Sequence, residues 1–194
     1  MSEPVYPLFL RLTGRLVVVV GAGRVAEQKI EKLIEAGAKL CIVAPVVSDG
    51  VRALAEARGS EIRARPFQST DIDGAWLVVA CTDDATANAE VSRACEARRV
   101  FCLAVDDIAH ASCFGGAEVR REPFTIAIST GSAAPAVARL VREIIELVLP
   151  ADDWVAEATA LRDRWKRDAT PMGSRFPELV RALAERAGYF GSPK

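Results

Sequence analysis

The chain has 194 residues, with 25 basic and 26 acidic side chains, so its formal net charge is −1. With 51% hydrophobic and 26% charged residues, its composition is that of an ordinary globular protein, which excludes disordered and collagen-like chains. Nucleic-acid binding normally needs a clearly basic face, and a net charge so close to zero gives no indication of one, so we expect no nucleic acid among its partners.

We also expect neither membrane insertion nor secretion. The longest apolar runs, such as residues 16–20, are far shorter than the roughly 20 residues that cross a bilayer. The N-terminal stretch contains Glu3 and two prolines and lacks a small-residue cleavage site, unlike a signal peptide. These observations predict a cytoplasmic protein.

The cysteines and the single histidine, His110, bear on redox state and metal binding. The chain has five cysteines, none of them spaced as C-x-x-C, and we expect them to be reduced core residues. One histidine and no cysteine pair cannot supply the four ligands of a closed zinc site within one chain. We therefore predict no metal.

From residue 15 to residue 103, short apolar runs alternate with segments of helical period, a pattern typical of a parallel sheet with crossover helices. The predicted strands are residues 16–20, 39–44, 61–65, 76–81 and 101–105. The predicted helices are residues 24–36, 48–58 and 85–99. We expect Gly37 to cap the first helix at its C-terminus, and Asp83 or Asp84 to cap the third at its N-terminus. The fold class is therefore α/β, with a Rossmann-like NAD-binding domain.

The pattern changes beyond about residue 110. Residues 113–121 and 124–129 are predicted as two further strands, and a long helix starts near Pro135 and ends at Pro150. One stripe of this helix is apolar, formed by Val137, Leu140, Val141, Ile144, Ile145 and Val148. We interpret the stripe as a dimer or interdomain contact, with packing on its own sheet as the alternative.

Two charged helices, residues 152–168 and 174–188, are predicted around a break at Thr170–Gly173. The chain is thus divided into a Rossmann-type domain (1–112), a central segment for dimerisation (113–150) and a helical C-terminal domain (151–194).

The sharpest motif runs from Gly21 to Ala26, directly after the first strand, and opens a helix. Gly21 permits the tight turn, Gly23 lets the backbone approach a pyrophosphate, and Ala26 replaces the third glycine of the dinucleotide-binding motif. The N–H groups and the dipole of the helix would hold the phosphates. The alternative is a tight turn that binds nothing.

The second strand ends in Ala44-Pro45-Val46, without the acid that usually binds an adenosine ribose. No arginine is adjacent to bind a 2′-phosphate, so charge does not decide between NAD and NADP. We expect backbone groups of Pro45 and Val46 to contact the adenosine.

Polar residues follow the fourth and fifth strands, at the edge where ligands bind in open α/β sheets. Thr82 is predicted near the nicotinamide. Of the pair Asp106-Asp107, one carboxylate could act as a general base beside the hydride acceptor, or the pair could simply form a turn. His110 fits a solvated loop position better than a catalytic one.

The loop Ser129-Thr130-Gly131-Ser132 precedes the helix at Pro135, so hydroxyls and free N–H groups converge where anions are favoured. Ordinary helix capping is the alternative.

Taken together, YPLFLRLTGRLVVVVGAGRVAEQKIEKLIEAGA, VVACTDDATANAEVSRAC, FCLAVDD and FTIAISTGSAAPAVARLVRE resemble the precorrin-2 dehydrogenase family, the N-terminal module of siroheme synthase. The resemblance covers residues 6–148 and implies NAD-dependent oxidation of precorrin-2 to sirohydrochlorin. It places the general base on Asp106 and cofactor contacts on Arg24, Val25, Pro45 and Val46. It also implies a homodimer, and a separate methyltransferase that acts on uroporphyrinogen upstream.

The substrate carries many carboxylates, so cations and N–H donors must line its cleft. The candidates are Arg120, Arg121, Arg139 and the loop from Ser129 to Ser132. Some members of the family also insert iron into sirohydrochlorin. Here Gly115 and Gly116 stand where the family commonly has a stretch that contains proline. The resemblance therefore does not decide whether this chain inserts iron.

Two functions of other classes remain as alternatives on the same fold. One is an NAD-binding redox sensor that regulates a partner, and the other is an oxidoreductase for a small acid or aldehyde.

Overall fold

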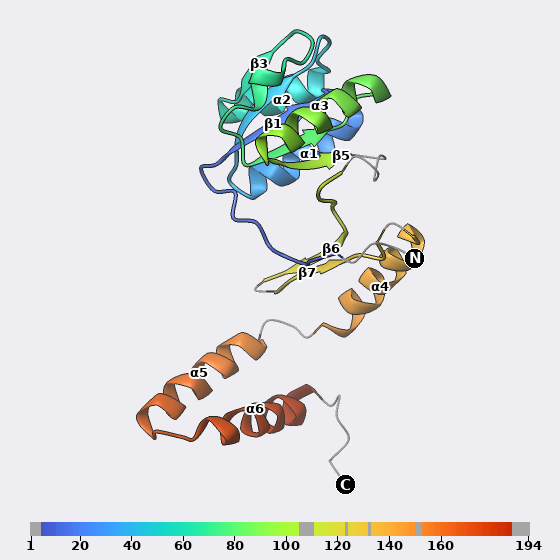
Figure 1. Ribbon diagram of the computed structural model, residues 1–194. Helices are drawn as coiled ribbons and strands as arrows, with labels where there is room; N and C mark the ends of the chain where they lie inside the picture. Colours follow the sequence, from blue (N-terminus) through green and yellow to red (C-terminus); the bar gives the residue numbers. More distant parts are fainter. Residues whose placement is uncertain (1–4, 105–110, 123, 132, 150–152, 188–194) are drawn as a thin grey trace. The chain divides into compact units, whose positions relative to one another are not determined.

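The computed structural model describes residues 5–104, 111–122, 124–131, 133–149 and 153–187 (Figure 1). These residues form two compact units, the first ending at Gly115 and the second beginning at Gly116.

The first unit is built on a five-stranded sheet in the order β3-β2-β1-β4-β5, in which all neighbouring strands are parallel. The strands are β1 (Leu16–Val20), β2 (Lys39–Val43), β3 (Glu61–Arg63), β4 (Leu77–Ala80) and β5 (Phe101–Ala104). The sheet confirms the predicted Rossmann-like fold. Its strand order reverses between β1 and β4, and ligands of open α/β sheets bind at the carboxyl ends of the strands at such a reversal.

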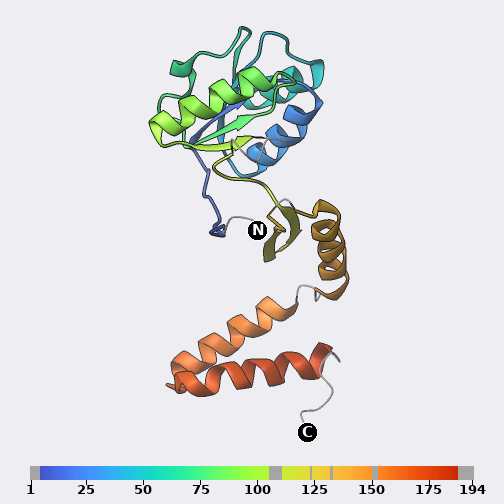
Figure 2. The ribbon, with the colours of Figure 1, turned by 45° about the vertical axis from the view of Figure 1, so that its right-hand side comes forward.

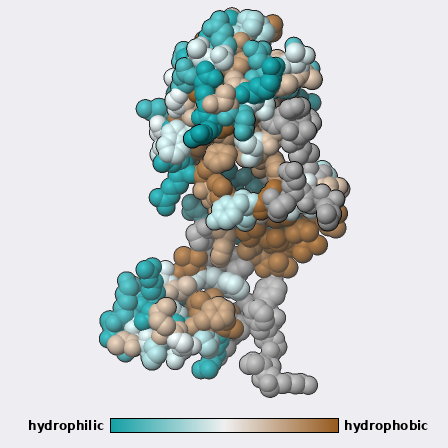
Figure 3. Space-filling model, in the orientation of Figure 1, coloured by the Kyte–Doolittle hydropathy of each residue, from teal (hydrophilic) through white to brown (hydrophobic). Residues whose placement is uncertain are grey.

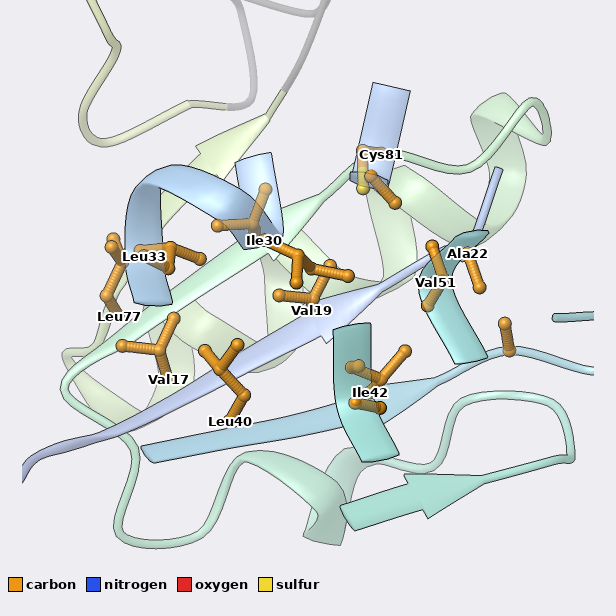
Figure 4. Close-up of a cluster of buried hydrophobic side chains, with 14 of the residues drawn as sticks. Val17, Val19, Ala22, Ile30, Leu33, Leu40, Ile42, Val51, Leu77 and Cys81 are labelled. Atoms are coloured by element: carbon orange, nitrogen blue, oxygen red, sulfur yellow. The ribbon is translucent and has the colours of Figure 1, made fainter. Parts of the chain in front are cut away.

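Helices cover both faces of this sheet, which is why four consecutive valines of β1, residues 17–20, are all buried. On one face, α1 (Arg24–Glu35) and α2 (Asp49–Arg58) pack on a core that includes Val17, Val19 and Ile42 (Figure 4). On the other face, α3 (Ala85–Arg98) and the short 3-10 helix η1 (Ser69–Ile72) pack on a core around Val18 and Val78.

Both predicted helix caps of the first unit are confirmed. Gly37 has a φ of 73°, and its N–H donates to Ile34 O (2.9 Å) while that of Ala38 donates to Leu33 O (3.0 Å). These two bonds close α1 in a Schellman motif. Asp84 caps α3 by accepting from the N–H groups of Thr86 (2.8 Å) and Ala87 (3.2 Å).

Residues 112 and 113, which follow β5 in the chain, form hydrogen bonds with Cys102 of that strand. Ser112 Oγ accepts from the N–H of Cys102 (2.8 Å). In return, Cys102 O accepts from the N–H groups of Ser112 (3.0 Å) and Cys113 (3.1 Å). These bonds hold Cys113 beside Leu103 in an isolated parallel bridge.

The second unit begins with an antiparallel hairpin of β6 (Ala117–Arg121) and β7 (Phe124–Ile128). The prediction that the first of these strands starts at residue 113 is wrong, because the backbone of residues 112–113 is already bonded to Cys102 and two glycines follow. The helix α4 (Pro135–Val148) packs on the hairpin and buries Ala138, while Val119 of β6 is buried as well.

A large part of the apolar stripe of α4 is not covered within its own unit. Val137, Leu140 and Ile144 are 51%, 55% and 49% exposed, and Figure 3 shows hydrophobic side chains gathered over this helix. The helix therefore packs on its own sheet through one side and presents an adjoining apolar side to solvent.

The two last helices, α5 (Asp153–Arg167) and α6 (Met172–Ala187), lie side by side in Figures 1 and 2. Trp165 Nε1 donates to Glu178 Oε2 (2.6 Å), and Arg164 pairs with the same carboxylate. The helix α6 starts two residues earlier than expected, because Ser174 N–H already donates to Pro171 O (3.1 Å). Among the described residues, no helix is both long and apolar enough to span a bilayer.

Candidate functional site

The glycine turn after β1 forms the centre of the candidate site. Gly21 has a φ of 112°, and a Cβ built there would lie 2.5 Å from Cys81 O. Only glycine therefore allows β1 to turn this close to the end of β4. Ala26 is completely buried, as expected of the residue where the helix meets the sheet.

The first turn of α1 leaves backbone donors free for an anion. Gly23 is the N-cap and offers no side chain to the first N–H groups of the helix, and a Cβ there would meet nothing within 4 Å. The first helical bond runs from Glu27 N–H to Gly23 O (3.1 Å). The N–H groups of Arg24 and Val25 thus have no acceptor within the helix and can bind a pyrophosphate.

The loop between β2 and α2 lies against this turn. Ser48 N–H donates to Ala22 O (3.1 Å), which brings Pro45 and Val46 close to the glycine turn. Pro45 is exposed, and Val46 is 81% exposed. An exposed apolar residue beside a phosphate-binding turn suits the apolar face of an adenosine.

The end of β4 adds Thr82, held in place by Asn88. Asn88 Oδ1 accepts from the N–H of Thr82 (3.1 Å), and its Nδ2 donates to Thr82 O (2.9 Å). The hydroxyl of Thr82 lies 2.8 Å from Asn88 Oδ1 and 2.9 Å from Asp84 O. Thr82 is thus rigidly placed next to Gly21.

Asn88 is a positioning residue that the sequence analysis did not single out as part of the site. It is buried on α3, six residues after its partner. A lone asparagine on a predicted helix is a signal that could have found it, because a buried amide needs hydrogen-bond partners.

The predicted site residues Asp106 and Ser132 lie outside the described residues, as do Asp107 and His110. Asp106 was predicted as the general base and Ser132 as a substrate contact. The predicted cofactor ligands all belong to the first unit and lie at the carboxyl edge of its sheet: Gly21, Gly23, Arg24, Val25, Pro45, Val46 and Thr82.

The described substrate candidates, Arg120, Arg121, Ser129, Thr130, Gly131 and Arg139, all belong to the second unit. The three arginines have partners there. Arg120 pairs with Glu118 (3.2 Å), Arg139 pairs with Glu143 (3.0 Å), and Arg121 donates to Leu149 O at the end of α4 (2.6 Å).

The hydroxyls of the loop before α4 are also engaged locally. Ser129 Oγ accepts from Gly131 N–H (3.1 Å), and Thr130 Oγ1 accepts from Ala134 N–H (3.2 Å). These bonds order the start of the helix. The assignment of the arginines and this loop to substrate binding stays a prediction.

The cysteines are all free thiols, four buried and Cys113 half-buried. Burial raises the pKa of Cys81 to about 12 and that of Cys113 to about 11, so these thiols are protonated and unreactive at neutral pH. Within the ranges that the structure describes, no three His, Cys, Asp or Glu side chains gather so as to hold a metal ion.

Residues 8–117 match a family described as "Putative NAD(P)-binding". The siroheme synthase of Pseudomonas paraeruginosa is 44% identical over 180 residues, which cover 93% of this chain and 37% of that protein. Siroheme synthase 3 of Aeromonas hydrophila is 39% identical over 185 residues, which cover 94% of this chain and 40% of that protein. The chain thus spans less than half the length of these relatives.

Among solved structures, that of SirC, a precorrin-2 dehydrogenase, superimposes with a TM-score of 0.71 and 22% sequence identity. The match covers 91% of this chain and 88% of the other. The two proteins share a fold.

Proposed function

Since the chain belongs to the NAD(P)-binding family that matches residues 8–117, we propose that it is an NAD-dependent precorrin-2 dehydrogenase, which forms sirohydrochlorin. The observation that carries the proposal is the open glycine turn at the reversal of strand order, in a chain 44% identical over 180 residues to a siroheme synthase. The resemblance of the ordered motifs to precorrin-2 dehydrogenases supports the same conclusion.

The residues at the sheet edge fit NAD. The free N–H groups of Arg24 and Val25 would hold the pyrophosphate, Pro45 and Val46 the adenosine, and Thr82 the nicotinamide end. Bound NAD supplies a hydride acceptor. The oxidation removes one hydride and one proton from precorrin-2, and we assign the proton to the carboxylate of Asp106.

The decisive experiment follows NADH absorbance after addition of anaerobically generated precorrin-2. We expect the wild type to reduce NAD, and Asp106→Ala to lower the rate at least about a hundredfold, which is a common loss on removal of a general base. Asp107→Ala and His110→Ala are the matched controls and should remain within about threefold. Equal activity of Asp106→Ala and the wild type would refute the assignment of the base.

The substrate-binding residues are tested by KM. We propose that Arg121 and Arg139 bind carboxylates of the tetrapyrrole, supported by their charge and by the exposure of Arg139. If Arg121→Ala and Arg139→Ala both leave the KM for precorrin-2 unchanged, these residues have no such role.

We further propose that the enzyme is a cytoplasmic homodimer, whose substrate comes from a separate uroporphyrinogen methyltransferase. The five free thiols suit a reducing compartment. The exposed apolar side of α4 supports the dimer.

Activity measurements with precorrin-2 and with simple substrates test the two alternative functions of the same site. A redox sensor would bind NAD without oxidising precorrin-2, and a different oxidoreductase would turn over a simple hydroxy acid or aldehyde. Iron insertion is a separate activity, and cobalt or iron uptake by sirohydrochlorin above the uncatalysed rate would demonstrate it.

A further inference from the structure

Lys29, on the second turn of α1, is a half-buried lysine close to the end of the first unit. Its Nζ lies 3.8 Å from the position of a Cβ built on Gly115. Its positive charge also acts on the thiol of Cys81, the residue that follows β4 and is labelled in Figure 4. The ammonium group therefore lies beside Gly115 and within electrostatic range of the residue that follows β4, within the first unit.

This ammonium group has no anionic partner among the residues that the structure describes. Glu27, two residues earlier on the same helix, points its carboxylate at Gly50 instead. Asp83 also lies within electrostatic range of Cys81 but forms no ion pair with Lys29. Since none of the described residues neutralises this half-buried charge, an anion that reached Lys29 would gain a charge-assisted hydrogen bond.

An anion from solvent can reach this group. Lys29 is only half-buried, and Gly115, the described residue next to Nζ, is exposed and has no side chain to cover it. The group also lies close to the reacting end of the cofactor site, because the glycine turn touches Cys81 and Thr82.

We propose that Lys29 binds a carboxylate of the tetrapyrrole substrate and so positions the ring beside the nicotinamide. The inference rests on the proposed function and adds a substrate contact on the cofactor-binding unit itself. The phosphates of the cofactor are a less suitable anion for Lys29 than a carboxylate of the substrate. They bind at the first N–H groups of α1, and Lys29 lies five residues further on, a rise of about 7.5 Å along the helix.

The experiment compares Lys29→Gln and Lys29→Arg with Lys39→Gln as the control. Lys39 is an exposed lysine at the start of β2, at the amino ends of the strands and so away from the predicted cofactor site. For each protein, one measures kcat and KM with precorrin-2, the Kd for NAD, and the Kd for sirohydrochlorin by absorbance titration. Thermal melting confirms that each variant is folded.

We expect Lys29→Gln to raise the KM for precorrin-2 and the Kd for sirohydrochlorin at least about tenfold, because one charge-assisted bond is lost. The Kd for NAD should stay within twofold. Lys29→Arg, which keeps the charge, should recover most of the binding, and Lys39→Gln should match the wild type.

The inference is overturned if Lys29→Gln binds sirohydrochlorin as Lys39→Gln does, or if its main defect is in the Kd for NAD. Failure of the proposed function gives a different result. The wild type would then not reduce NAD with precorrin-2, although its binding of sirohydrochlorin would still depend on Lys29. A wild type that neither oxidises nor binds the tetrapyrrole would refute both.

Discussion

At the scale of single residues, the two glycines of the turn after β1 have different tasks. Gly21 needs both its positive φ and the absence of a Cβ, because that atom would overlap Cys81 O. Gly23 has ordinary φ and open space around it, so its lack of a side chain matters only to a ligand. The motif alone identified both residues, because its spacing after a strand is a local signal.

This difference can be measured with two alanine variants. Gly21→Ala should lower the free energy of unfolding by more than about 2 kcal/mol, because it combines backbone strain with a clash in a packed turn. Gly23→Ala should unfold like the wild type in urea but bind NAD at least about tenfold more weakly by calorimetry. Comparable stability of the two variants would contradict this division. Gly59→Ala, with positive φ but no close neighbour, serves as a control for strain alone.

Asn88 shows what the sequence could not reveal at this scale. Its importance lies in two backbone bonds to Thr82, and these exist only when α3 lies against the end of β4. A lone asparagine on a predicted helix indicates an amide that needs partners, but the sequence pattern does not identify the backbone of Thr82 as that partner.

Replacing Asn88 by alanine should therefore affect both stability and cofactor binding. We expect a loss of about 1–3 kcal/mol in unfolding free energy, because the partly buried backbone N–H and C=O of Thr82 lose their partners. The KM for NAD should rise as Thr82 loses its fixed position. Gln28→Ala, an exposed amide on α1, is the control. A variant with normal KM for NAD would show that Asn88 has only a structural role.

At the scale of elements, an ion-pair cluster joins β3 to η1. The carboxylate of Asp71 is buried and accepts from Arg65 (2.5 Å), from Arg63 (2.7 Å) and from the N–H of Gln68 (2.8 Å). The hydrogen bond from Arg65 is the main cause that holds the pKa of Asp71 at about 2, below its ordinary value of 3.8, against the opposing effect of burial. The cluster thus fixes the segment that leads from the sheet edge to β4.

This cluster makes part of the stability sensitive to acid. Because the pKa of Asp71 is lower in the folded state, its contribution is fully present above about pH 4 and is lost as the pH falls toward 2. A shift of this size corresponds to about 2 kcal/mol. Asp71→Asn should remove that contribution at pH 7 and flatten the acid limb in urea unfolding.

The matched control is Asp73→Asn. Asp73 is 61% exposed and forms a surface pair with Arg98 (2.8 Å), so its loss should cost less than about 1 kcal/mol. Identical acid limbs for Asp71→Asn and the wild type would show that the cluster does not stabilise the fold.

The elements themselves were largely predictable, because strands covered on both faces are continuous apolar runs and amphipathic helices repeat locally. All five strands of the sheet and α1 to α3 lie where the pattern indicated, with ends that differ by one or two residues. The helix η1 and the late start of β6 were not predicted. The start of β6 depends on the bonds of residues 112 and 113 to Cys102, and η1 on the polar bonds of Asp71 to Arg63, Arg65 and Gln68, and a hydrophobic pattern records neither.

At the scale of the whole molecule, the exposed side of α4 should determine the oligomeric state. Leu140→Glu combined with Ile144→Glu places two charges in the proposed dimer contact, so we expect sedimentation velocity to show the 20.8 kDa monomer in place of a dimer. Glu146→Ala, on the polar side of the helix, should leave the dimer intact. A wild type that sediments as a monomer at all concentrations would contradict the dimer itself.

The bonds that fasten residues 112 and 113 back onto Cys102 have a consequence for how this protein can change over evolution. They hold residues 112 and 113 on β5 through the backbone of Cys102, so we expect the strand to keep its place when the length of the chain before Ser112 changes. Doubling the length of a closed segment adds only about 0.6 kcal/mol of closure entropy. The predicted cofactor ligands Gly21 and Thr82 follow β1 and β4, outside that part of the chain. New chemistry could therefore be selected on a library of inserts between Ala104 and Ser112 while the dinucleotide site is inherited unchanged.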